Sequence, residues 1–407
     1  MNGHDGMNGW RTHRIEELVD RVANPVEVTK EGDYQEIGVR SHGKGIFHKP
    51  PISGSELGNK RVYWVEPNCF VVNIVFAWEQ AVARTTETER GMIASHRFPM
   101  YRPKANRLDL DYLLLFFKTP YGKHLLSLAS PGGAGRNKTL GQEAFLGLSI
   151  PVPPLPEQRQ IAAILGKWDE AIRLTADLIA AKQQRKKGLM QRLLSGEVRF
   201  PGFEGRGWWE VSIGTITDVT AGGTPNTNHS EFWKDGTIPW MRSGEVHKKR
   251  VYSVGETITR LGMESSNAKL IPPNSILIAL AGQGKTRGTV AINKIELTTN
   301  QSIAAIIPDA DQVYYEYLFY DLDSRYEELR RLSAGDGGRG GLNLALIKGL
   351  SLRLPSIEEQ KKVAAILNAC DQELALLQQK LAALQQQKKG LMQQLLTGRV
   401  RVRTSEA

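Results

Sequence analysis

The sequence predicts an α/β protein in which two irregular α/β domains are joined and separated by two long helices that form an antiparallel coiled coil. Three observations predict this fold class. A 43-residue segment occurs twice, apolar residues recur along both copies at coiled-coil spacing, and the stretches between them contain short β segments bounded by turn residues. The duplication also predicts a pseudo-two-fold internal repeat.

The repeat consists of residues 157–199 and 359–401, which align without a gap at one offset (359 − 157 = 202) and share 23 of 43 residues. A period of this length is too long for a solenoid, so it predicts two copies of a larger unit, each a variable globular part followed by a constant helix. We expect a first globular domain at 1–150 with a disordered leader at 1–9, a first helix at 151–199, a second globular domain at 200–349, and a second helix and tail at 350–407.

Each copy of the repeat predicts one long helix with an apolar seam. The first seam comprises Ile161, Leu165, Trp168, Ile172, Ile179, Leu189 and Leu193, and the second comprises Val363, Leu367, Cys370, Leu374, Leu377, Leu381, Leu384, Leu391 and Leu395. The interruptions are Thr175, Lys182, Lys186 and Lys388. Two matching seams predict that the helices pack on each other, antiparallel if a two-fold axis relates the units. The alternative is that each helix packs on its own globular domain or on another chain.

The globular stretches predict short elements. In the first stretch we expect a helix that starts at Trp10 and continues through Ile15, Leu18, Val19 and Val22, then β segments at 34–40, 61–66, 70–78 and 92–98, and a helical stretch at 109–130 that breaks before Pro120. The second stretch opens similarly, since residues 208–222 resemble residues 10–24. The two stretches diverge after that point, which suits two modules with one task and different targets.

The charge balance favours a polyanionic partner. The 407 residues include 53 Lys and Arg against 43 Asp and Glu, a formal net charge of +10 with a pI near 9.4. Only two cysteines, Cys69 and Cys370, argue against a disulfide framework or a Cys-rich zinc site. The most apolar run, 70–78, is too short to cross a bilayer. We therefore expect a cytoplasmic protein with no membrane partner.

Basic and polar residues gather in the predicted loops, and such side chains hold phosphates and read base edges in the major groove. The candidates in the first domain are Arg40, Ser41, His42, Lys44, His96, Arg97, Arg136 and Lys138. Those in the second are Thr224, Asn226, Arg242, Lys248, Gln283, Lys285, Arg287 and Arg339. Taken singly, each could instead be an ordinary solvated residue.

One motif points elsewhere. Residues 279–286 (ALAGQGKT) approach the phosphate-binding pattern G-x-x-x-x-G-K-[ST], but Ala279 replaces the first glycine and the following residues predict a second strand. A Gly-rich hairpin aimed at DNA fits better. The sequence contains no dinucleotide fingerprint, spaced His/Cys metal set or nucleophile elbow. We therefore expect no catalytic residue, metal or cofactor, with a nucleotide-binding protein and a coiled-coil scaffold without DNA contact as the alternatives.

Together these features resemble the specificity (S) subunit of a type I restriction-modification system. The resemblance rests on Leu155-x-Glu157-Gln158 after Pro154 and Ile357-x-Glu359-Gln360 after Pro355, on AAIL, and on KKGLMQxLL(S/T)G, each of which occurs twice. The second copy departs slightly, with Ser356 and Glu358 where the first has Pro154 and Pro156. AGGTPNTNHSEFW followed by GTIPW in the second domain is similar to a pattern frequent in that family. The resemblance spans nearly the whole chain.

This resemblance implies that each variable domain is a target recognition domain that reads one half of a bipartite, asymmetric site in double-stranded DNA. It implies that the helices set the spacing and dock two methylation subunits, joined by restriction subunits. S-adenosylmethionine, ATP and Mg would be bound by those partners, and this chain would not be an enzyme. Residues expected to serve partner docking or helix packing are Glu157, Gln158, Ile161, Leu165, Glu359, Gln360, Val363 and Leu367. The recognised bases, the spacer length and the stoichiometry are not predicted.

Overall fold

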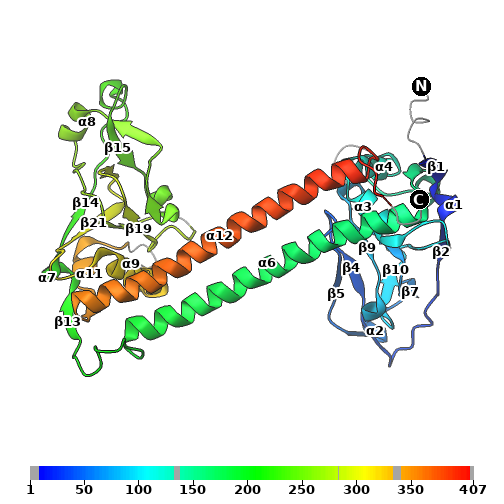
Figure 1. The fold of residues 1–407 in the computed structure, drawn as a ribbon, viewed down its shortest axis with the longest axis horizontal. Coiled ribbons are helices and arrows are strands. Elements are labelled where there is room, and N and C mark those ends of the chain that lie inside the picture. Colours follow the sequence, from blue (N-terminus) through cyan, green and yellow to red (C-terminus); the bar gives the residue numbers. More distant parts are fainter. Residues whose placement is uncertain (1–8, 133–137, 283, 333–340, 404–407) are drawn as a thin grey trace. The chain divides into compact units, whose positions relative to one another are not determined.

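A computed structural model describes residues 9–132, 138–282, 284–332 and 341–403 (Figure 1). The chain divides into two compact units: the first contains Met1–Ala176 and Gln379–Ala407, and the second contains Asp177–Gln378. The leader predicted at 1–9 lies, except for Gly9, outside the described residues. Among the described helices, none is both long and apolar enough to span a membrane.

The elements up to the first long helix follow the order β1 (Arg11–Arg14), α1 (Ile15–Leu18), β2 (Val19–Val22), β3 (Asp33–Tyr34), β4 (Ile37–Val39), β5 (Ile46–His48), β6 (Ile52–Ser53), α2 (Gly54–Leu57), β7 (Val62–Trp64), β8 (Phe70–Val72), η1 (Ala77–Glu79), β9 (Val82–Arg84), η2 (Glu87–Glu89), β10 (Ile93–Ser95), β11 (Met100–Pro103), α3 (Leu110–Phe117), α4 (Pro120–Leu128), α5 (Gln142–Leu146), β12 (Ser149–Val152) and α6 (Leu155–Ser195).

The remaining elements follow the order β13 (Trp209–Ser212), α7 (Ile213–Ile216), β14 (Thr217–Ala221), η3 (Ser230–Phe232), β15 (Ile238–Met241), η4 (Ser243–Lys248), β16 (Arg250–Val251), β17 (Glu256–Ile258), α8 (Arg260–Glu264), β18 (Ile276–Ala279), β19 (Val290–Asn293), β20 (Thr298–Thr299), β21 (Ile303–Pro308), α9 (Tyr315–Ser324), α10 (Tyr326–Leu332), α11 (Leu344–Lys348), β22 (Ser351–Leu354) and α12 (Ile357–Leu395).

The two units contain a sheet with the same strand arrangement, which has four strands in the first unit and a fifth strand in the second. The first has the strand order β2-β11-β8-β9, and the second has β14-β21-β18-β19 followed by β16. All of these neighbours are antiparallel except β16, which runs parallel to β19. The connection between β8 and β9 therefore corresponds to the connection between β18 and β19. A small antiparallel pair, β1-β12 or β13-β22, closes each unit beside the long helix that follows it.

Two predictions in the first unit need correction. The helix expected from Trp10 is a single turn, α1, because Arg11–Arg14 pair with β12 and Val19–Val22 pair with β11 as strands. The strand expected at 70–78 ends at Val72, because Asn73 Oδ1 accepts the Val75 N–H at 3.1 Å and turns the chain. The predicted break before Pro120 is confirmed: Thr119 caps α4, with its hydroxyl accepting the Gly122 N–H at 3.0 Å.

The prediction of two long antiparallel helices is confirmed within each unit. In the first unit, Lys388 of α12 lies 2.5 Å from Asp169 of α6, so this ion pair links the two helices. In the second, Lys186 of α6 lies 2.5 Å from Asp371 of α12. The two pairs are equivalent at the repeat offset, which explains why a lysine interrupts each seam at this position. The seam leucines between them are half-buried, as expected where only two helices pack together.

The helix ends belong to the cores of the globular parts. Ile161 and Leu165, the first seam residues of α6, are fully buried among Phe70, Tyr112 and other residues of the first unit. Leu395 of α12 completes this core from the opposite direction. The second core repeats the arrangement with Val363, Leu367 and Leu193. Each globular part therefore rests on the start of one long helix and the end of the other.

Candidate nucleic-acid interface

In the first unit, the predicted DNA-binding residues that the structure describes, all except Arg136, come together around the β8–β9 connection, residues 73–81. The main-chain N–H groups of His42 and Gly43 donate to the carbonyls of Glu79 and Gln80 at 2.7 and 2.8 Å. The N–H of Ile74 donates to the carbonyl of Arg97 at 3.0 Å. We call residues 40–45, 73–81, 95–98 and 138–140 the first loop cluster.

Side chains reinforce the first loop cluster. The Ser41 hydroxyl donates to the Glu79 carboxylate at 2.9 Å, and Lys138 lies over the Trp78 ring at 5.7 Å from its centroid. The Leu140 N–H donates to the Ile74 carbonyl at 2.8 Å, which holds the end of the loop that contains Lys138. Arg40 turns back to donate to the Ile46 carbonyl at 3.1 Å. The exposed candidates of this cluster are Arg40, His42, Lys44, His96 and Arg97.

The turn at 40–45 packs tightly against Lys118, which follows α3. A Cβ built on Gly43 would lie 2.9 Å from Lys118 Cε, and Gly43 has φ +63°, so glycine suits this position twice over. Burial lowers the pKa of Lys118, while the charge of Asp169 opposes that shift. The side chain of Lys118 therefore packs against this turn, and its ammonium group also interacts electrostatically with Asp169 on α6.

In the second unit, the contacts centre on the turn at 299–302, which precedes β21 and lies against the start of the β18–β19 connection. The N–H of Asn300 donates to the Met241 carbonyl at 3.0 Å, next to Arg242, and the N–H of Leu280 donates to the Ser302 carbonyl at 2.8 Å. The Thr224 hydroxyl donates to the side chain of Gln301. We call residues 222–227, 242–248, 280–282, 284–289 and 299–302 the second loop cluster.

Glycine is required where the first segment of this cluster meets the turn. A Cβ on Gly222 would lie 2.1 Å from the Thr299 carbonyl oxygen, so only glycine allows the two backbones to approach this closely. The neighbouring Gly223 N–H then donates to the same carbonyl at 2.9 Å. This close approach places Thr224 against Gln301.

The β18–β19 connection is a hairpin loop, as predicted. Strand β18 is followed by an antiparallel strand and not by a helix, so residues 279–286 lack the helix N-terminus on which a nucleotide phosphate would sit. Lys285 is exposed, and its carbonyl accepts the Tyr326 hydroxyl at 3.1 Å. The Gly284 carbonyl accepts a hydrogen bond from Arg330 at 2.8 Å. Helix α10 therefore holds this loop in place.

The structure describes four further predicted residues of the second unit, Arg242, Lys248, Asn226 and Arg287. Arg242 pairs with Glu256 at 2.6 Å, and Lys248 pairs with Glu245 at 2.6 Å, so both cations already have an acidic partner. The carbonyl of Asn226 accepts the Trp233 indole N–H at 3.3 Å, and Arg287 is half-buried. Arg136, Gln283 and Arg339 lie outside the described residues.

Several residues of these clusters were not predicted from the sequence. Phe76 is 37% exposed, and Trp78 and Glu79 are half-exposed, but the apolar run at 70–78 masked them as a strand. Gln301 is exposed at the end of the turn that precedes β21. Asn73 and the Asn-Gln-Ser run at 300–302 were the available signals, because such residues favour turns between apolar strands.

The eight residues expected at the helix starts are all buried within their own units. Gln158 donates to the carbonyls of Arg107 and Pro153 at 3.0 and 2.9 Å and accepts the Asp109 N–H at 2.7 Å. Gln360 makes the equivalent contacts to Gln312, Pro355 and Tyr314, at 3.2, 2.9 and 2.7 Å. These amides join each helix start to the loop before α3 or α9.

In the part of the chain that the structure describes, no group of three or more His, Cys, Asp or Glu residues could hold a metal ion.

Comparison with known proteins identifies the family. The family model for the type I restriction modification DNA specificity domain matches residues 9–182 and 205–386, so the chain belongs to this family. It is 31% identical over 234 residues to the EcoR124I/EcoR124II specificity subunit of a type I restriction enzyme from Escherichia coli, and the match covers 55% of each protein. It is 25% identical over 320 residues to the putative type I restriction enzyme MjaX specificity subunit from Methanocaldococcus jannaschii, over 75% of this chain and 71% of that protein.

Solved structures share the fold over nearly their full length. The HsdS subunit from Thermoanaerobacter tengcongensis superposes with a TM-score of 0.54 at 19% identity, over 96% of this chain and 97% of that one. The type I S subunit from M. genitalium gives a TM-score of 0.60 at 16% identity, over 97% and 98%. The family assignment confirms the prediction of a specificity subunit, a component of a restriction-modification enzyme that is not itself the catalyst.

Proposed function

We propose that this chain reads a bipartite, asymmetric site in double-stranded DNA, with one loop cluster contacting each half. The observation that carries this proposal is that each unit gathers exposed polar, basic or aromatic side chains beside an equivalent strand connection, β8–β9 in the first unit and β18–β19 in the second. The family to which the chain belongs, and its net charge of +10, support DNA as the ligand. The recognition domains are assigned to 1–150 and 200–349.

The chemistry of the two clusters differs, which suits two different half-sites. In the first, Arg97 and Lys138 can neutralise phosphates, Glu79 can accept from a cytosine amino group, and exposed Phe76 can contact a thymine methyl. In the second, Gln301 can pair with an adenine edge and Lys285 can contact a phosphate. Arg242 and Lys248 would have to leave acidic partners first, so they rank lower as contacts.

The long helices would set the number of base pairs between the half-sites and dock two methylation subunits, with restriction subunits joining the complex. S-adenosylmethionine, ATP and Mg would be bound by those partners, and the complex would work in the cytoplasm. We assign the eight buried residues at the helix starts to packing, since their side chains contact their own unit. Docking surfaces would then lie on the exposed faces of the helices.

Two single substitutions test the proposal. In the assembled complex with its methylation partners, Phe76→Ala should change the bases accepted in one half-site and Gln301→Ala those in the other. Methylome sequencing of cells that express each variant measures both halves at once. Tyr252→Ala, at an aromatic side chain that is 67% exposed outside both clusters, should leave the motif unchanged. A change in both halves from either variant, or a methylome with no split motif, would contradict this assignment.

A further inference from the structure

A chain of polar side chains connects the second recognition domain to the long helices inside the second unit. Arg250, the first residue of β16, donates through Nη2 to Glu316 of α9 at 2.6 Å and to Asn368 of α12 at 2.5 Å. The same nitrogen donates to the Tyr320 hydroxyl at 3.2 Å. That hydroxyl in turn donates to Asp371 of α12 at 2.6 Å. One arginine therefore contacts both the recognition domain and the helix.

The chain continues onto the other long helix and is compensated in charge. Lys186 of α6 lies 2.5 Å from Asp371, and its ammonium group lies over the Tyr320 ring at 5.2 Å from the centroid. On the domain side, Lys294 pairs with the buried Glu316 at 3.0 Å. Three cations thus share two carboxylates in a partly buried layer, where leaving any member unpaired is costly.

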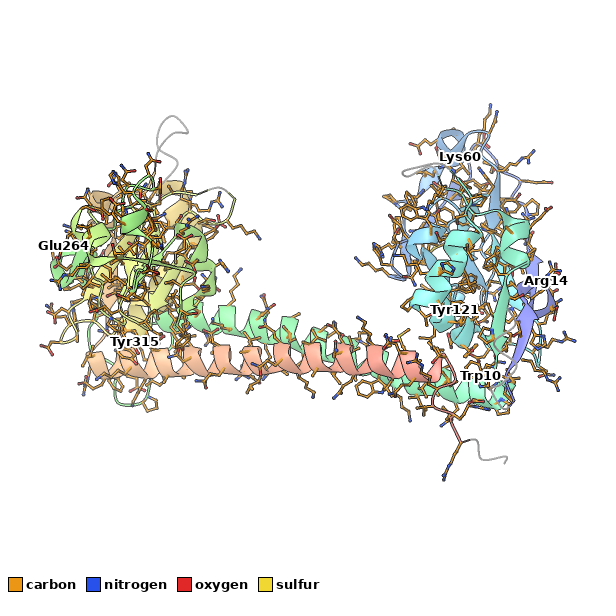
Figure 2. The ribbon with its side chains drawn as sticks, turned by 90° about the horizontal axis from the view of Figure 1, so that it is seen from above. Trp10, Arg14, Lys60, Tyr121, Glu264 and Tyr315 are labelled. Atoms are coloured by element: carbon orange, nitrogen blue, oxygen red, sulfur yellow. The ribbon has the colours of Figure 1, made fainter. Side chains whose placement is uncertain are left out.

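The hydroxyl of Tyr320 is the link between the two sides. Burial, followed by the hydrogen bond to Asp371, raises the pKa of Tyr320, so the hydroxyl keeps its proton and can donate a hydrogen bond to the carboxylate. Hydrogen bonds are directional, whereas apolar contacts tolerate sliding. The layer beneath Arg250 therefore specifies one orientation of the domain on the helix pair. Figure 2 shows Tyr315, the first residue of the same helix α9, beside the start of α12.

The first unit lacks two of these polar groups, the hydroxyl of Tyr320 and the amide of Asn368, at the equivalent positions. Tyr112 and Tyr317 both donate to a carbonyl in the strand before the long helix, at 3.1 and 2.9 Å, which aligns α3 with α9. On this alignment Tyr320 corresponds to Leu115, and at the repeat offset Asn368 corresponds to Gly166. A Cβ on Gly166 would meet no atom within 4 Å. Two other parts of the layer recur: the lysine–aspartate pair of the helices, as Lys388 and Asp169, and an ion pair on the tyrosine-bearing helix, as Arg84 and Asp111.

We propose that Arg250 and Tyr320 are positioning residues that fix the angle of the second recognition domain on the helices, and thereby restrict the complex to one spacer length between half-sites. This inference rests on the proposed function. The helices set the distance between the half-sites, and the Arg250–Tyr320–Asp371 chain prevents the second recognition domain from tilting on the helices. A tilt would move the second loop cluster along the DNA without changing which bases it reads.

The test is Tyr320→Phe in the full chain assembled with its methylation partners. The matched control is Tyr317→Phe, which removes a hydroxyl from the same helix but one bonded to the Arg353 carbonyl and not to α12. A library of the recognised split site, with the spacer lengthened or shortened by one base pair, is methylated and sequenced. Tyr320→Phe should raise methylation at the altered spacers, relative to the native spacer, by about fivefold to tenfold. Both half-site sequences should stay unchanged, and Tyr317→Phe should keep the native spacer profile.

Two results would overturn the inference alone. One is a Tyr320→Phe complex that keeps the native spacer profile, even if it methylates more slowly. The other is equal broadening by Tyr317→Phe, which would reveal a general loss of stability and not loss of the link to α12. If the unaltered chain directed no methylation at a split site, the proposed function itself would fail, and that outcome is visible before any variant is made.

Discussion

Arg401 holds both carboxylate oxygens of Glu157, with Nε and Nη2 each 2.7 Å from one oxygen. Glu157 is 2% exposed and sits at the start of α6, whereas Arg401 lies beyond the end of α12. Arg199 and Glu359 form the equivalent fork in the second unit, at 2.6 and 2.8 Å. In each unit, the residue that leaves one long helix secures the residue that begins the other.

Arg401→Ala should lower the free energy of unfolding of the first unit by about 2–4 kcal/mol, because it leaves a buried carboxylate without its partner. Urea denaturation followed by fluorescence measures this loss. Arg399→Ala, two residues earlier and exposed, serves as the control and should cost under about 0.5 kcal/mol. Equal effects from the two variants would show that the fork contributes no specific stability.

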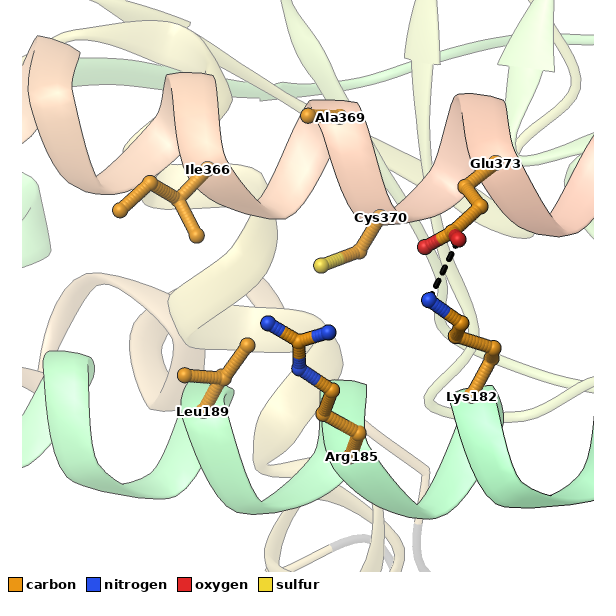
Figure 3. Close-up of a pocket in the computed structure, with 7 residues that line it drawn as sticks. All are labelled: Lys182, Arg185, Leu189, Ile366, Ala369, Cys370 and Glu373. Carbon is orange, nitrogen blue, oxygen red and sulfur yellow. Dashed lines mark ion pairs between the residues drawn. The ribbon is translucent and has the colours of Figure 1, made fainter.

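A cavity of about 240 Å³ between α6 and α12 in the second unit gives a packing test (Figure 3). It is lined by Cys370, Leu189, Ile366 and the ion pair of Lys182 with Glu373. The residue equivalent to Cys370 in the first unit is Trp168. Cys370→Leu should fill part of the cavity and stabilise the second unit by about 0.5–1.5 kcal/mol. Trp168→Cys should cost about 1–3 kcal/mol in the first unit.

Thermal denaturation of both variants checks the pair. If Cys370→Leu destabilised the protein, the cavity would be too narrow for a branched side chain. The larger Trp168 at the equivalent position of the first unit would then not indicate free space beside Cys370.

Lys138→Ala should weaken binding of the complex to DNA almost equally for every sequence and reduce the slope of log affinity against log salt by about 1, because one phosphate contact is lost. Fluorescence anisotropy between low and moderate salt gives this slope. Arg14→Ala removes a cation on β1, outside the first loop cluster, that is paired with Glu16, and should leave the slope as it was. A changed half-site preference for Lys138→Ala would instead mean that Lys138 reads a base.

Asp321 predicts a dependence of stability on pH. Its burial raises the pKa of the carboxyl to about 6, although Arg325 opposes the shift. The folded state therefore binds the proton more tightly than the unfolded chain, so this contribution to stability is fully present below pH 4 and lost as the pH rises through about 6. Asp321→Asn should be more stable than the native chain at pH 8, by about 1–3 kcal/mol, with no advantage at pH 4.

Denaturation of both proteins across this pH range measures the difference. Asp309→Asn is a control with the opposite sign, since hydrogen bonds from Gln312 and the Asp311 N–H lower the pKa of Asp309. That variant should lose stability at neutral pH relative to acid. A constant difference between Asp321→Asn and the native chain would contradict the assignment.

The helical part of the fold could be predicted because it depends on local periodicity and on a repeat that needs no spatial knowledge. Even the lysines that interrupt the seams were visible, although their partners Asp371 and Asp169 lie on the opposite helix and could not be assigned. The loop clusters were harder. Trp78 meets Lys138 because the Leu140 N–H donates to the Ile74 carbonyl, a contact between distant residues that the local sequence does not specify.

The candidate contacts show the same limit. Residue type and loop position were enough to select Ser41, His42 and Arg97, which do meet around one connection. They could not reveal that Arg242 is already paired with Glu256, or that Gln301 occupies the centre of the second cluster. Such facts depend on contacts between residues distant in the chain, which single-residue patterns do not contain.

The forks of Glu157 with Arg401 and of Glu359 with Arg199 have a consequence for inheritance. All four residues, and both lysine–aspartate pairs of the helices, recur at the repeat offset with identical side chains. A genetic crossover between the two copies, or with the corresponding gene of another lineage, would exchange one partner of a pair for the same residue. New combinations of globular domains could therefore arise by recombination while every one of these ion pairs keeps a partner.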